Sequence, residues 1–527
     1  MICYPKNLFL GIALILGLPT VPMAGDPPAA ETPESWYRSG QDLIEQRRAR
    51  FAGLPTARNV ILFVGDGMSL ATVAAARVLE GQQRGESGEE NSLVFERFEH
   101  LALAKTYNTN QQTPDSAGTM TAMATGVKSF AGAIAVDQRA RRGDCASVAG
   151  NELVSLLDLA ALAGMGTGIV TTARLTHATP AALYAHSPDR RWESDAGVPP
   201  TARAQGCRDI AQQLIAYDTG RGIDIALGGG RRAFLPIQQS DPEYPELMGH
   251  RADGRDLTAE WLERRPDGHY VWNREQWLAL PDDGGPVLGL FETDHMQYEH
   301  DRASDTAGEP SLSEMTAMAV ERLSSRPEGF FLMVEGARID HAHHANNAYR
   351  ALVDTIELAR AVQAAMERVD PSETLIVVTA DHGHALTFGG YGRRGNPIMG
   401  VAMRPDYEGG GISPLTDPEG RKLTVLGYAT GPGYRGGKRP DYDRVDPTQP
   451  SFRQESTVEQ WSATHTAEDV AIYATGPGAE PLFGVIEQHA LFHALVQAAP
   501  RLAAIASELE AESGLPVLED SGTQSPE

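Results

Sequence analysis

Short runs of apolar residues recur along most of the chain, separated by stretches with helical periodicity. The run NVILFV at 59–64 is continuously apolar, as expected for a strand buried on both faces. Further strands are predicted at Leu101–Tyr107, Gly166–Thr172, Ile223–Leu227, Val287–Phe291, Phe330–Val334 and Leu375–Thr379. Helices are predicted at Glu152–Ala163, Cys207–Tyr217, Ser311–Ser325 and Asn346–Val369. This alternation is typical of a doubly wound α/β fold, with helices flanking a mostly parallel central sheet.

Two stretches depart from this rhythm. Residues Glu31–Phe51 form an amphipathic helical pattern ahead of the first strand, which could pack on the outside of the fold or on a second subunit. Residues 388–455 are rich in Gly, Pro, Tyr and Arg, which indicates an inserted subdomain. We therefore predict the following organisation: an N-terminal linker and helix at 25–58, a main α/β domain at 59–387 and 456–510, the insertion at 388–455, and a polar tail at 511–527.

The N-terminus has the pattern of a signal peptide at residues 1–24. Lys6 provides a positive charge, Leu8–Leu18 is an apolar run of suitable length, and small residues precede a plausible cleavage site near Ala24. The apolar run is shorter than a membrane-spanning helix requires, and the polar C-terminal residues do not form a hydrophobic anchor signal. We expect a periplasmic or secreted protein without a membrane anchor.

Charge and composition narrow the possible partners. The chain has 527 residues, 41% of them hydrophobic, and a net charge of -25. Such an acidic surface argues against nucleic acid or an anionic membrane as a partner. A site for an anionic substrate must therefore carry its own positive charge, from metal ions or arginine. Of the three cysteines, Cys3 would leave with the signal peptide, and we expect Cys145 and Cys207 to form a disulfide in an exported protein.

Acids and histidines follow one apolar run after another. In open α/β sheets the carboxyl ends of the strands meet at one edge, where ligands bind. The residues that would collect there are Asp66, His177, Thr179, Glu335, Asp340, His344, Asp381, His382 and His384. Asp340 and His344 are spaced i, i+4 and would share one face of a helix. Carboxylate with imidazole is ordinary zinc chemistry, whereas Asp66 and Glu335 with a hydroxyl suit magnesium.

The stretch Thr113–Gly126 (TPDSAGTMTAMATG) places Asp115 and Ser116 at the start of a predicted helix. The free N–H groups and positive dipole end of a helix N-terminus favour an anion beside the serine hydroxyl. Taken alone, Asp-Ser before a helix is more often an N-cap than a reactive site. Spacing also leaves the role of His465, in the segment THTAEDV, undecided.

Taken together, the motifs closely resemble those of the metal-dependent alkaline phosphatases. They run in the family's order over about residues 59–490: VGDGM, TPDSAGTMTAMATG, HATPAALYAH, WESDAGVP, LGGGR, VEGARIDHAHH, TADHGH, GPGY and THTAEDV. The resemblance implies an enzyme that hydrolyses phosphate monoesters, a homodimer, and an N-terminal helix packed on the partner subunit. The insertion at 388–455 would correspond to the family's crown.

The resemblance also implies roles for individual residues. Ser116 matches the nucleophile, Arg190 the phosphate-clamping arginine that Asp115 helps orient, and His384 a histidine lining the first zinc site. The first zinc would be held by Asp340, His344 and His465, and the second by Asp66, Asp381 and His382 with Ser116. The magnesium ligands would be Asp66, Thr179 and Glu335. His177, where other bacterial members carry Asp, would affect the magnesium site from the second shell of ligands.

Animal-type members of the family also carry a calcium site. Here Glu243, Glu292 and the carbonyl of Phe291 resemble its ligands, and Glu309 is the expected fourth, with Asp305 as the alternative. Rival interpretations of the chain are a phosphodiesterase or sulfatase on the same scaffold, or a catalytically silent extracellular protein stabilised by metals. Retention of Ser116, Arg190 and every metal ligand argues against a silent protein.

Overall fold

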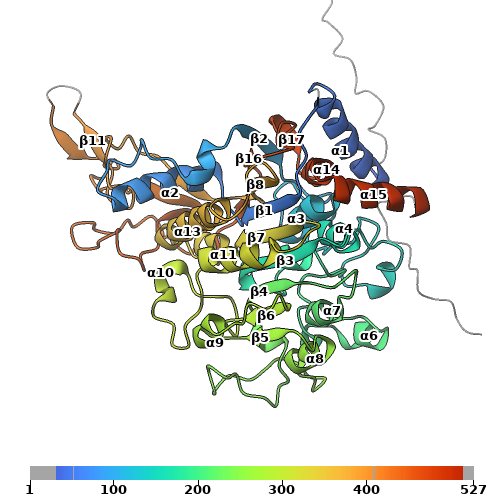
Figure 1. Cartoon of the computed structure of the whole chain (residues 1–527). Coiled ribbons are helices and arrows are strands. Elements are labelled where there is room, and N and C mark those ends of the chain that lie inside the picture. Colours follow the sequence, from blue (N-terminus) through green and yellow to red (C-terminus); the bar gives the residue numbers. More distant parts are fainter. Residues whose placement is uncertain (1–30, 52, 407–409, 514–527) are drawn as a thin grey trace, which may run out of the picture. The chain divides into compact units, whose positions relative to one another are not determined.

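The computed structural model of the chain describes residues 31–51, 53–406 and 410–513 (Figure 1). The predicted signal peptide and the last fourteen residues of the predicted polar tail lie outside the described residues. Contacts divide the chain at Thr32, and all the elements below belong to the unit that begins at Pro33.

A ten-stranded sheet is the centre of the fold, in the order β17-β2-β16-β8-β1-β7-β3-β4-β6-β5. Its strands are β1 (Asn59–Gly65), β2 (His100–Lys105), β3 (Gly166–Arg174), β4 (Ile225–Gly229), β5 (His269–Val271), β6 (Val287–Leu290), β7 (Phe330–Gly336), β8 (Thr374–Ala380), β16 (Val470–Thr475) and β17 (Gly484–Glu487). Only β16 runs antiparallel to its neighbours in this sheet, β8 and β2. The predicted α/β fold with a mostly parallel sheet is confirmed.

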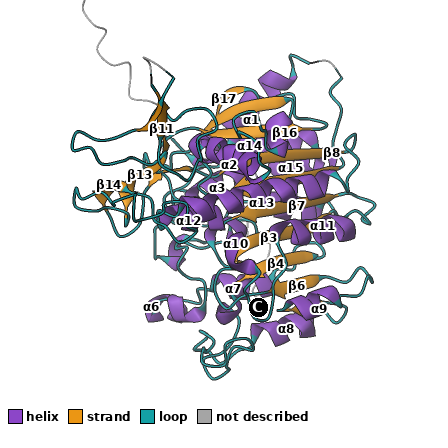
Figure 2. Cartoon of the chain, turned by 90° about the vertical axis from the view of Figure 1, so that its left-hand side faces the viewer, coloured by secondary structure: helices purple, strands orange, loops and turns teal. Residues whose placement is uncertain are grey.

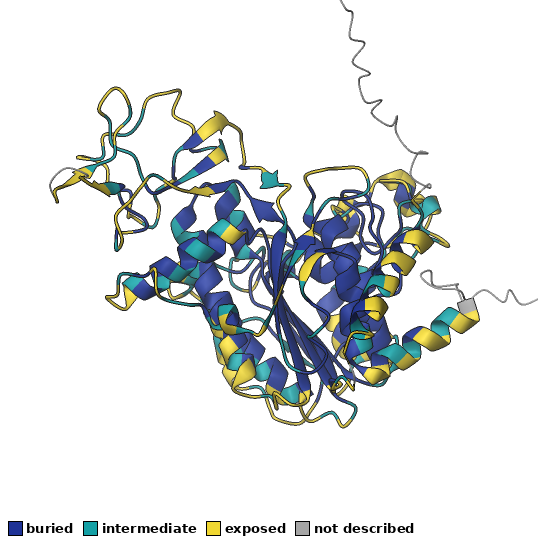
Figure 3. Cartoon of the chain, turned by 90° about the horizontal axis from the view of Figure 1, so that it is seen from above, coloured by how far each residue is buried: buried dark blue, intermediate teal, exposed yellow. Residues whose placement is uncertain are grey.

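Helices cover both faces of this sheet (Figures 2 and 3). One layer contains α2 (Leu70–Gln83), α11 (Leu312–Leu323) and α13 (Ala348–Met366), and the other α3 (Ser116–Thr125), α4 (Leu156–Leu162), α14 (Ala490–Ala498) and α15 (Pro500–Ser513). The remaining α-helices are α1 (Pro33–Arg48), α5 (Ala178–Ala181), α6 (Pro200–Ala204), α7 (Ile210–Ala216), α8 (Leu257–Arg264), α9 (Arg274–Leu278), α10 (Glu299–Arg302) and α12 (Arg338–His344).

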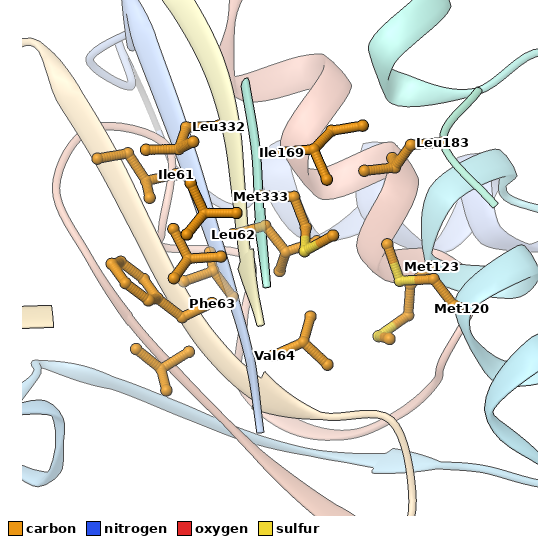
Figure 4. Packing of buried hydrophobic residues seen from close by; sticks show 14 of the residues in the cluster. Ile61, Leu62, Phe63, Val64, Met120, Met123, Ile169, Leu183, Leu332 and Met333 are labelled. Carbon is orange, nitrogen blue, oxygen red and sulfur yellow. The ribbon is translucent and has the colours of Figure 1, made fainter. Parts of the chain in front are cut away.

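Because both faces are covered, the central strands are buried along their whole length. Ile61, Leu62, Phe63 and Val64 of β1 are all fully buried, and they pack among side chains of the neighbouring strands and helices (Figure 4). This is why β1 is a continuous apolar run rather than an alternating one. The buried core holds the carboxyl ends of β1, β7 and β8 in fixed positions.

The predicted N-terminal helix is α1, which packs against α14 of the same chain. The ring of Tyr37 lies 4.5 Å from that of His493, and the ring of Trp36 lies 5.4 Å from that of His489. The hydroxyl of Ser39 is 3.1 Å from Nε2 of His489. Contact between this helix and a second subunit stays a prediction.

Residues 388–455 and their flanks contain two small sheets outside the central one. The first joins β10 (Leu386–Phe388), β13 (Leu426–Gly431) and β14 (Ser456–Glu459), and the second pairs β11 (Met403–Pro405) with β12 (Ile412–Pro414). A further pair, β9 (Gly383–His384) with β15 (His465–Thr466), lies at the candidate site. Much of this insertion is exposed (Figure 3).

The predicted disulfide is present between Cys145 and Cys207, whose Cα atoms are 5.8 Å apart. It packs against a small cluster of buried residues formed by Trp192, Val198 and Ala202. The bond therefore ties together two segments that are 62 residues apart in sequence.

Within the described ranges, no single helix is both long and apolar enough to cross a bilayer. The pair Ala490–Ala498 and Pro500–Glu512 meets the criterion only jointly, and its two helices are bent by 117°.

Candidate active site

Three carboxylates reach the same edge of the sheet from neighbouring strands. Asp66 directly follows β1, Glu335 lies near the end of β7, and Asp381 directly follows β8. The parallel register pairs Val64 with Glu335 and Gly65 with Ala380. Asp66 and Asp381, the residues that follow Gly65 and Ala380, therefore lie at the same end of the sheet as Glu335. All three side chains are fully buried. The predicted collection of acids at the strand ends is therefore present.

The first group of candidate metal ligands is Asp340, His344, His384 and His465, which offer ligand atoms within 4.8 Å of one another. Nε2 of His344 is 3.2 Å from Oδ2 of Asp340, because the two residues lie one turn apart on α12. His465, which spacing could not place, reaches this group because β15 pairs with β9 and sets it opposite His384. Its Nε2 is 3.3 Å from Nε2 of His344.

Backbone carbonyls orient these histidines. Nδ1 of His344 donates to the carbonyl of Ala463 over 2.7 Å, and Nδ1 of His465 donates to that of Pro114 over 2.9 Å. Each bond leaves Nε2 free to face the group's centre, an arrangement common around metal-binding histidines.

The second group is Asp66, Asp381 and His382. Nε2 of His382 lies 3.4 Å from Oδ1 of Asp66 and 3.3 Å from Oδ2 of Asp381. It also lies 3.2 Å from Oγ of Ser116, so the predicted nucleophile adjoins this group. The rings of His382 and His465 stack with centroids 3.6 Å apart, which makes the first and second groups immediate neighbours.

The third group is Asp66, His177 and Glu335. Asp66 belongs to both this group and the second, as expected of a ligand shared by two metal ions. The hydroxyl of Thr179 is buried and has no hydrogen-bond partner among the described residues. Thr171, which the sequence analysis did not identify, donates to Oε2 of Glu335 over 2.5 Å. It lies inside β3 rather than after it, so its position along the chain does not mark it as a residue at a strand end.

The charge balance of these groups calls for cations. Burial raises the pKa of Asp66 well above its usual value, and the carboxylates of Asp381, Asp340 and Glu335 raise it further. Burial likewise raises the pKa of Glu335 to about 8 and that of Asp381 to about 6. Both oxygens of Asp66, Oε1 of Glu335 and Oδ2 of Asp381 have no hydrogen bond from the described residues. Buried carboxylates without hydrogen bonds are stabilised by metal coordination.

The histidines are prepared for the same role. Burial lowers the pKa of His382 and of His465 to about 4, and neighbouring histidines contribute to both shifts. Both side chains are therefore neutral at ordinary pH, which is the form of imidazole that binds metal ions. Neutral imidazoles beside carboxylates fit zinc, while the oxygen donors Asp66, Glu335 and Thr179 fit magnesium.

Arg190 lies beside the nucleophile, between two predicted site residues. Its Nη1 donates to Oδ2 of Asp115 over 3.2 Å, and its Nη2 is 2.9 Å from Nε2 of His177. Oδ1 of Asp115 accepts from N–H of Gly118 and so caps α3. The N-cap alternative for this stretch is present, with Asp115 as the cap residue. Ser116 is the first residue of that helix, and its Oγ lies beside His382 of the second group, so its role as a reactive residue stays a prediction.

A fourth group lies outside these three and contains Glu243, Glu292 and Asp305. Both oxygens of Asp305 are buried without a hydrogen bond from the described residues. Glu309 lies close by. Burial raises its pKa well above the usual value, and the carboxylates of Glu292 and Asp305 raise it further. Its Oε1 accepts a hydrogen bond from the N–H of Gln297. The structure thus brings Asp305, the alternative ligand, into the group, while Glu309 lies beside it.

Comparison with known proteins agrees with this geometry. The family model for alkaline phosphatase matches residues 57–500. The chain is 44% identical to the tissue-nonspecific alkaline phosphatase of Gallus gallus and 43% identical to that of Homo sapiens, each over 483 residues and 90% of both chains. It is 42% identical to an alkaline phosphatase of Gadus morhua over 485 residues, 90% of this chain and 99% of that one.

Solved structures with the same fold are also alkaline phosphatases. The Thermus thermophilus enzyme aligns with a TM-score of 0.60 at 25% identity, covering 87% of this chain and 97% of that one. The enzyme of the Antarctic bacterium TAB5 aligns with a TM-score of 0.56 at 21% identity, covering 85% and 99%. Fold and site define a metal-binding hydrolase of the α/β class. The chain belongs to the alkaline phosphatase family, whose members are phosphoric monoester hydrolases.

Proposed function

We propose that this chain hydrolyses phosphate monoesters through a phosphoserine at Ser116, at a site that holds two zinc ions and one magnesium ion. The observation that carries the proposal is the 3.2 Å approach of Ser116 Oγ to Nε2 of His382, inside a group of buried, unpartnered metal ligands. Arg190, fixed by Asp115, supplies the positive charge that an acidic protein otherwise lacks for binding phosphate.

The donor sets assign an ion to each group. Asp340, His344 and His465 would hold one zinc, with His384 lining it. Asp66, Asp381 and His382 would hold the second, next to Ser116. Asp66, Glu335 and Thr179 would hold magnesium, with His177 alongside. When bound, these ions would lower the pKa of the serine hydroxyl and of a water, and offset the charge on phosphate and on the departing oxygen.

The chemistry of the chain's own residues follows from their positions. Arg190 binds two non-bridging phosphate oxygens with its planar guanidinium, and this fixes the phosphorus beside Ser116. Oγ of Ser116 attacks phosphorus, the bond from phosphorus to the ester oxygen breaks, and the alcohol departs. Water then attacks the phosphoserine, the bond to Oγ breaks, and inorganic phosphate is released. Covalent catalysis divides one difficult displacement into two easier ones.

The decisive experiment is the substitution Ser116→Ala, with Ser372→Ala at an exposed serine as control. The wild type and the control should form an acid-stable phosphoenzyme with labelled substrate, and Ser116→Ala should not. Turnover of a chromogenic phosphate monoester should fall by orders of magnitude in Ser116→Ala alone. Near-wild-type turnover of Ser116→Ala would exclude the nucleophile assignment.

Two further measurements test the cofactors and the reaction class. Elemental analysis of the purified protein should find zinc and magnesium in a ratio of about two to one, and chelation should abolish activity. Monoester turnover should far exceed that of the corresponding diester. Faster diester turnover would favour the phosphodiesterase interpretation instead.

We also propose that the protein is exported and works as a homodimer. The signal-peptide pattern at residues 1–24 and the disulfide between Cys145 and Cys207 support export. Light scattering coupled to size-exclusion chromatography tests the dimer, and cell fractionation tests the location. A monomer that is fully active at all concentrations would contradict the dimer.

A further inference from the structure

Basic side chains gather in one cleft of the insertion at 388–455, although the protein as a whole is strongly acidic. The cleft has a volume of about 690 Å³, and five of its eleven lining residues are basic: Arg435, Lys438, Arg439, Arg444 and Arg453. Along the whole chain, Lys and Arg make up only 45 of 527 residues, against 70 acids. Asp446 is the one described acid that lines the cleft. The cleft is therefore a local positive region on a protein of net charge -25.

Three of these cations are not neutralised by the protein. Among the residues with described positions, no acid forms an ion pair with Arg435, Lys438 or Arg453, and all three are exposed. Oδ1 of Asp446 accepts from the N–H and the hydroxyl of Thr448, at 2.9 and 2.7 Å, so this carboxylate is held within its own turn. Like charges gathered without counter-charges repel one another, and an anion in the cleft would relieve that repulsion.

The segment that lines the cleft is fixed at its ends and on the main domain. Nη2 of Arg435 donates to the carbonyl of Arg453 over 3.4 Å, which joins the two ends of the segment. The carbonyl of Pro450 accepts from Nη1 of Arg350 over 2.6 Å and from Nδ2 of Asn347 over 2.8 Å, both at the N-terminal end of α13. Because the chain here is already ordered, binding an anion would cost little conformational entropy.

The size and the apolar part of the lining indicate the kind of anion. A cleft of about 690 Å³ suits a ligand of many atoms rather than a single small ion. Phe452 and Val445 also line it and offer apolar surface beside the cations. Sugar rings have apolar faces, and the planar guanidinium of arginine pairs with sulfate oxygens as it does with phosphate. Clusters of Lys and Arg are typical of surfaces that bind heparin-like chains.

We propose that this cleft binds a sulfated polysaccharide and so docks the enzyme on such polymers. None of the candidate metal ligands lines the cleft, so docking would leave the active site open to substrate. Two other polyanions fit less well. A bilayer is flat and cannot enter a cleft, and a single-stranded nucleic acid stacks its bases on several aromatic side chains, whereas Phe452 is the one aromatic residue in this lining and is half-buried.

The test compares binding of the full-length enzyme to dextran sulfate and to dextran, which has the same sugar chain without sulfate. The wild type should bind dextran sulfate and not dextran. Lys438→Gln combined with Arg453→Gln removes two unpaired cations, so the Kd for dextran sulfate should rise by about tenfold. The slope of log K against log salt should fall by about one for each cation lost, as it does for phosphate contacts in nucleic acid complexes.

The matched control combines Arg393→Gln with Arg404→Gln, two exposed cations of the same insertion that do not line the cleft. It loses the same charge and should bind dextran sulfate as the wild type does. Turnover of a small phosphate monoester should be unchanged in both double variants, and its loss in the cleft variant alone would contradict a docking surface separate from the active site.

Three results would overturn the proposal on binding grounds. They are a wild type that does not bind dextran sulfate, equal affinities in the two double variants, and tighter binding of single-stranded DNA or of phosphatidylglycerol vesicles than of dextran sulfate. The last result would assign the cleft to a nucleic acid or a membrane instead.

Discussion

Arg190 is joined to Asp115 by a hydrogen bond of 3.2 Å from Nη1 to Oδ2. The same carboxylate accepts through Oδ1 from the N–H groups of Gly118 and Gly132, at 3.2 and 3.1 Å. Although burial raises the pKa of Asp115, Arg190 and these N–H groups lower it by more, so the residue stays ionised. One side chain thus caps the helix of the nucleophile and orients the arginine that would bind phosphate.

We expect Asp115→Asn to weaken phosphate binding without unfolding the protein. Asparagine can still cap α3, because its side-chain oxygen accepts from the same N–H groups. It removes the charge that holds Arg190, so the inhibition constant for inorganic phosphate should rise by about tenfold, the effect of losing one charge-assisted hydrogen bond. Competitive inhibition of monoester turnover measures it. An unchanged constant would show that Arg190 needs no orienting partner.

Gly67→Ala should disrupt the first and second metal-ligand groups together. Gly67 has φ +68°, and a Cβ there would lie 3.2 Å from Oδ1 of Asp340 and from Cδ2 of His384. The left-handed backbone alone costs about 1–2 kcal/mol for alanine. The N–H of Gly67 also donates to Oδ1 of Asp381 over 3.0 Å. We expect zinc affinity and turnover to fall by at least about tenfold.

Gly85→Ala is the control for that experiment, because it has a similarly positive φ of +84° and nothing within 4 Å of its Cβ. Its melting temperature should fall, because alanine is strained in the left-handed backbone conformation, and its zinc content should not change. Zinc loss in both variants would attribute the effect to backbone strain.

Acidification should release magnesium before the zinc of the first group. Glu335 has a pKa raised to about 8 in the metal-free protein, so protons compete with magnesium as pH falls through that value. In the first group, His344 and other neighbouring histidines hold the pKa of Asp340 well below its usual value despite burial, and the pKa of His465 is about 4. Zinc there should persist to a lower pH than magnesium does. Stability added by magnesium is therefore greatest above pH 8 and declines as pH falls below it.

Equilibrium dialysis at stepped pH, followed by elemental analysis, measures both releases. Glu335→Gln should remove the magnesium step near pH 8 and leave zinc bound at neutral pH. Simultaneous loss of the two metals at one pH would contradict separate sites.

Replacing both Cys145 and Cys207 by serine should destabilise the protein and leave its turnover unchanged. The disulfide closes a loop of 62 residues, whose entropy corresponds to about 4 kcal/mol in the free energy of unfolding. Denaturant unfolding of the oxidised wild type and the double variant measures the difference. Turnover of the folded variant should match the wild type, because the bond packs on Trp192 and Val198 rather than on the metal-ligand groups. A large loss of turnover would link this loop to the site.

Asp305→Asn and Glu309→Gln decide which residue completes the calcium site. Asp305 offers two buried oxygens with no hydrogen bond from the described residues, whereas Glu309 offers only Oε2, because its Oε1 accepts from the N–H of Gln297. Added calcium should raise the melting temperature of the wild type and of Glu309→Gln, and it should have little effect on Asp305→Asn. The opposite pattern would assign the ligand to Glu309.

Much of the catalytic geometry could be predicted because it depends on local spacing. Asp340 and His344 lie on one turn of α12, and Asp66 and Asp381 directly follow apolar strands, so their grouping follows from helix periodicity and from the parallel sheet. The features that could not be predicted were those that no local sequence pattern marks. Thr171 was missed because it lies within β3, and the strand β5 was missed because it spans only three residues.

The sequence by itself determined the fold class and the family and predicted the candidate metal ligands, since these rest on periodicity and on motifs read along the chain. Tertiary structure decided which distant residues meet. It set His465 opposite His384 through the pairing of β15 with β9, and it turned β16 antiparallel to β8. It also placed Asp305 with Glu243, and Ser462 beside Nδ1 of His344. Such contacts depend on strand register and loop path, which the burial of the whole core fixes and no local pattern encodes.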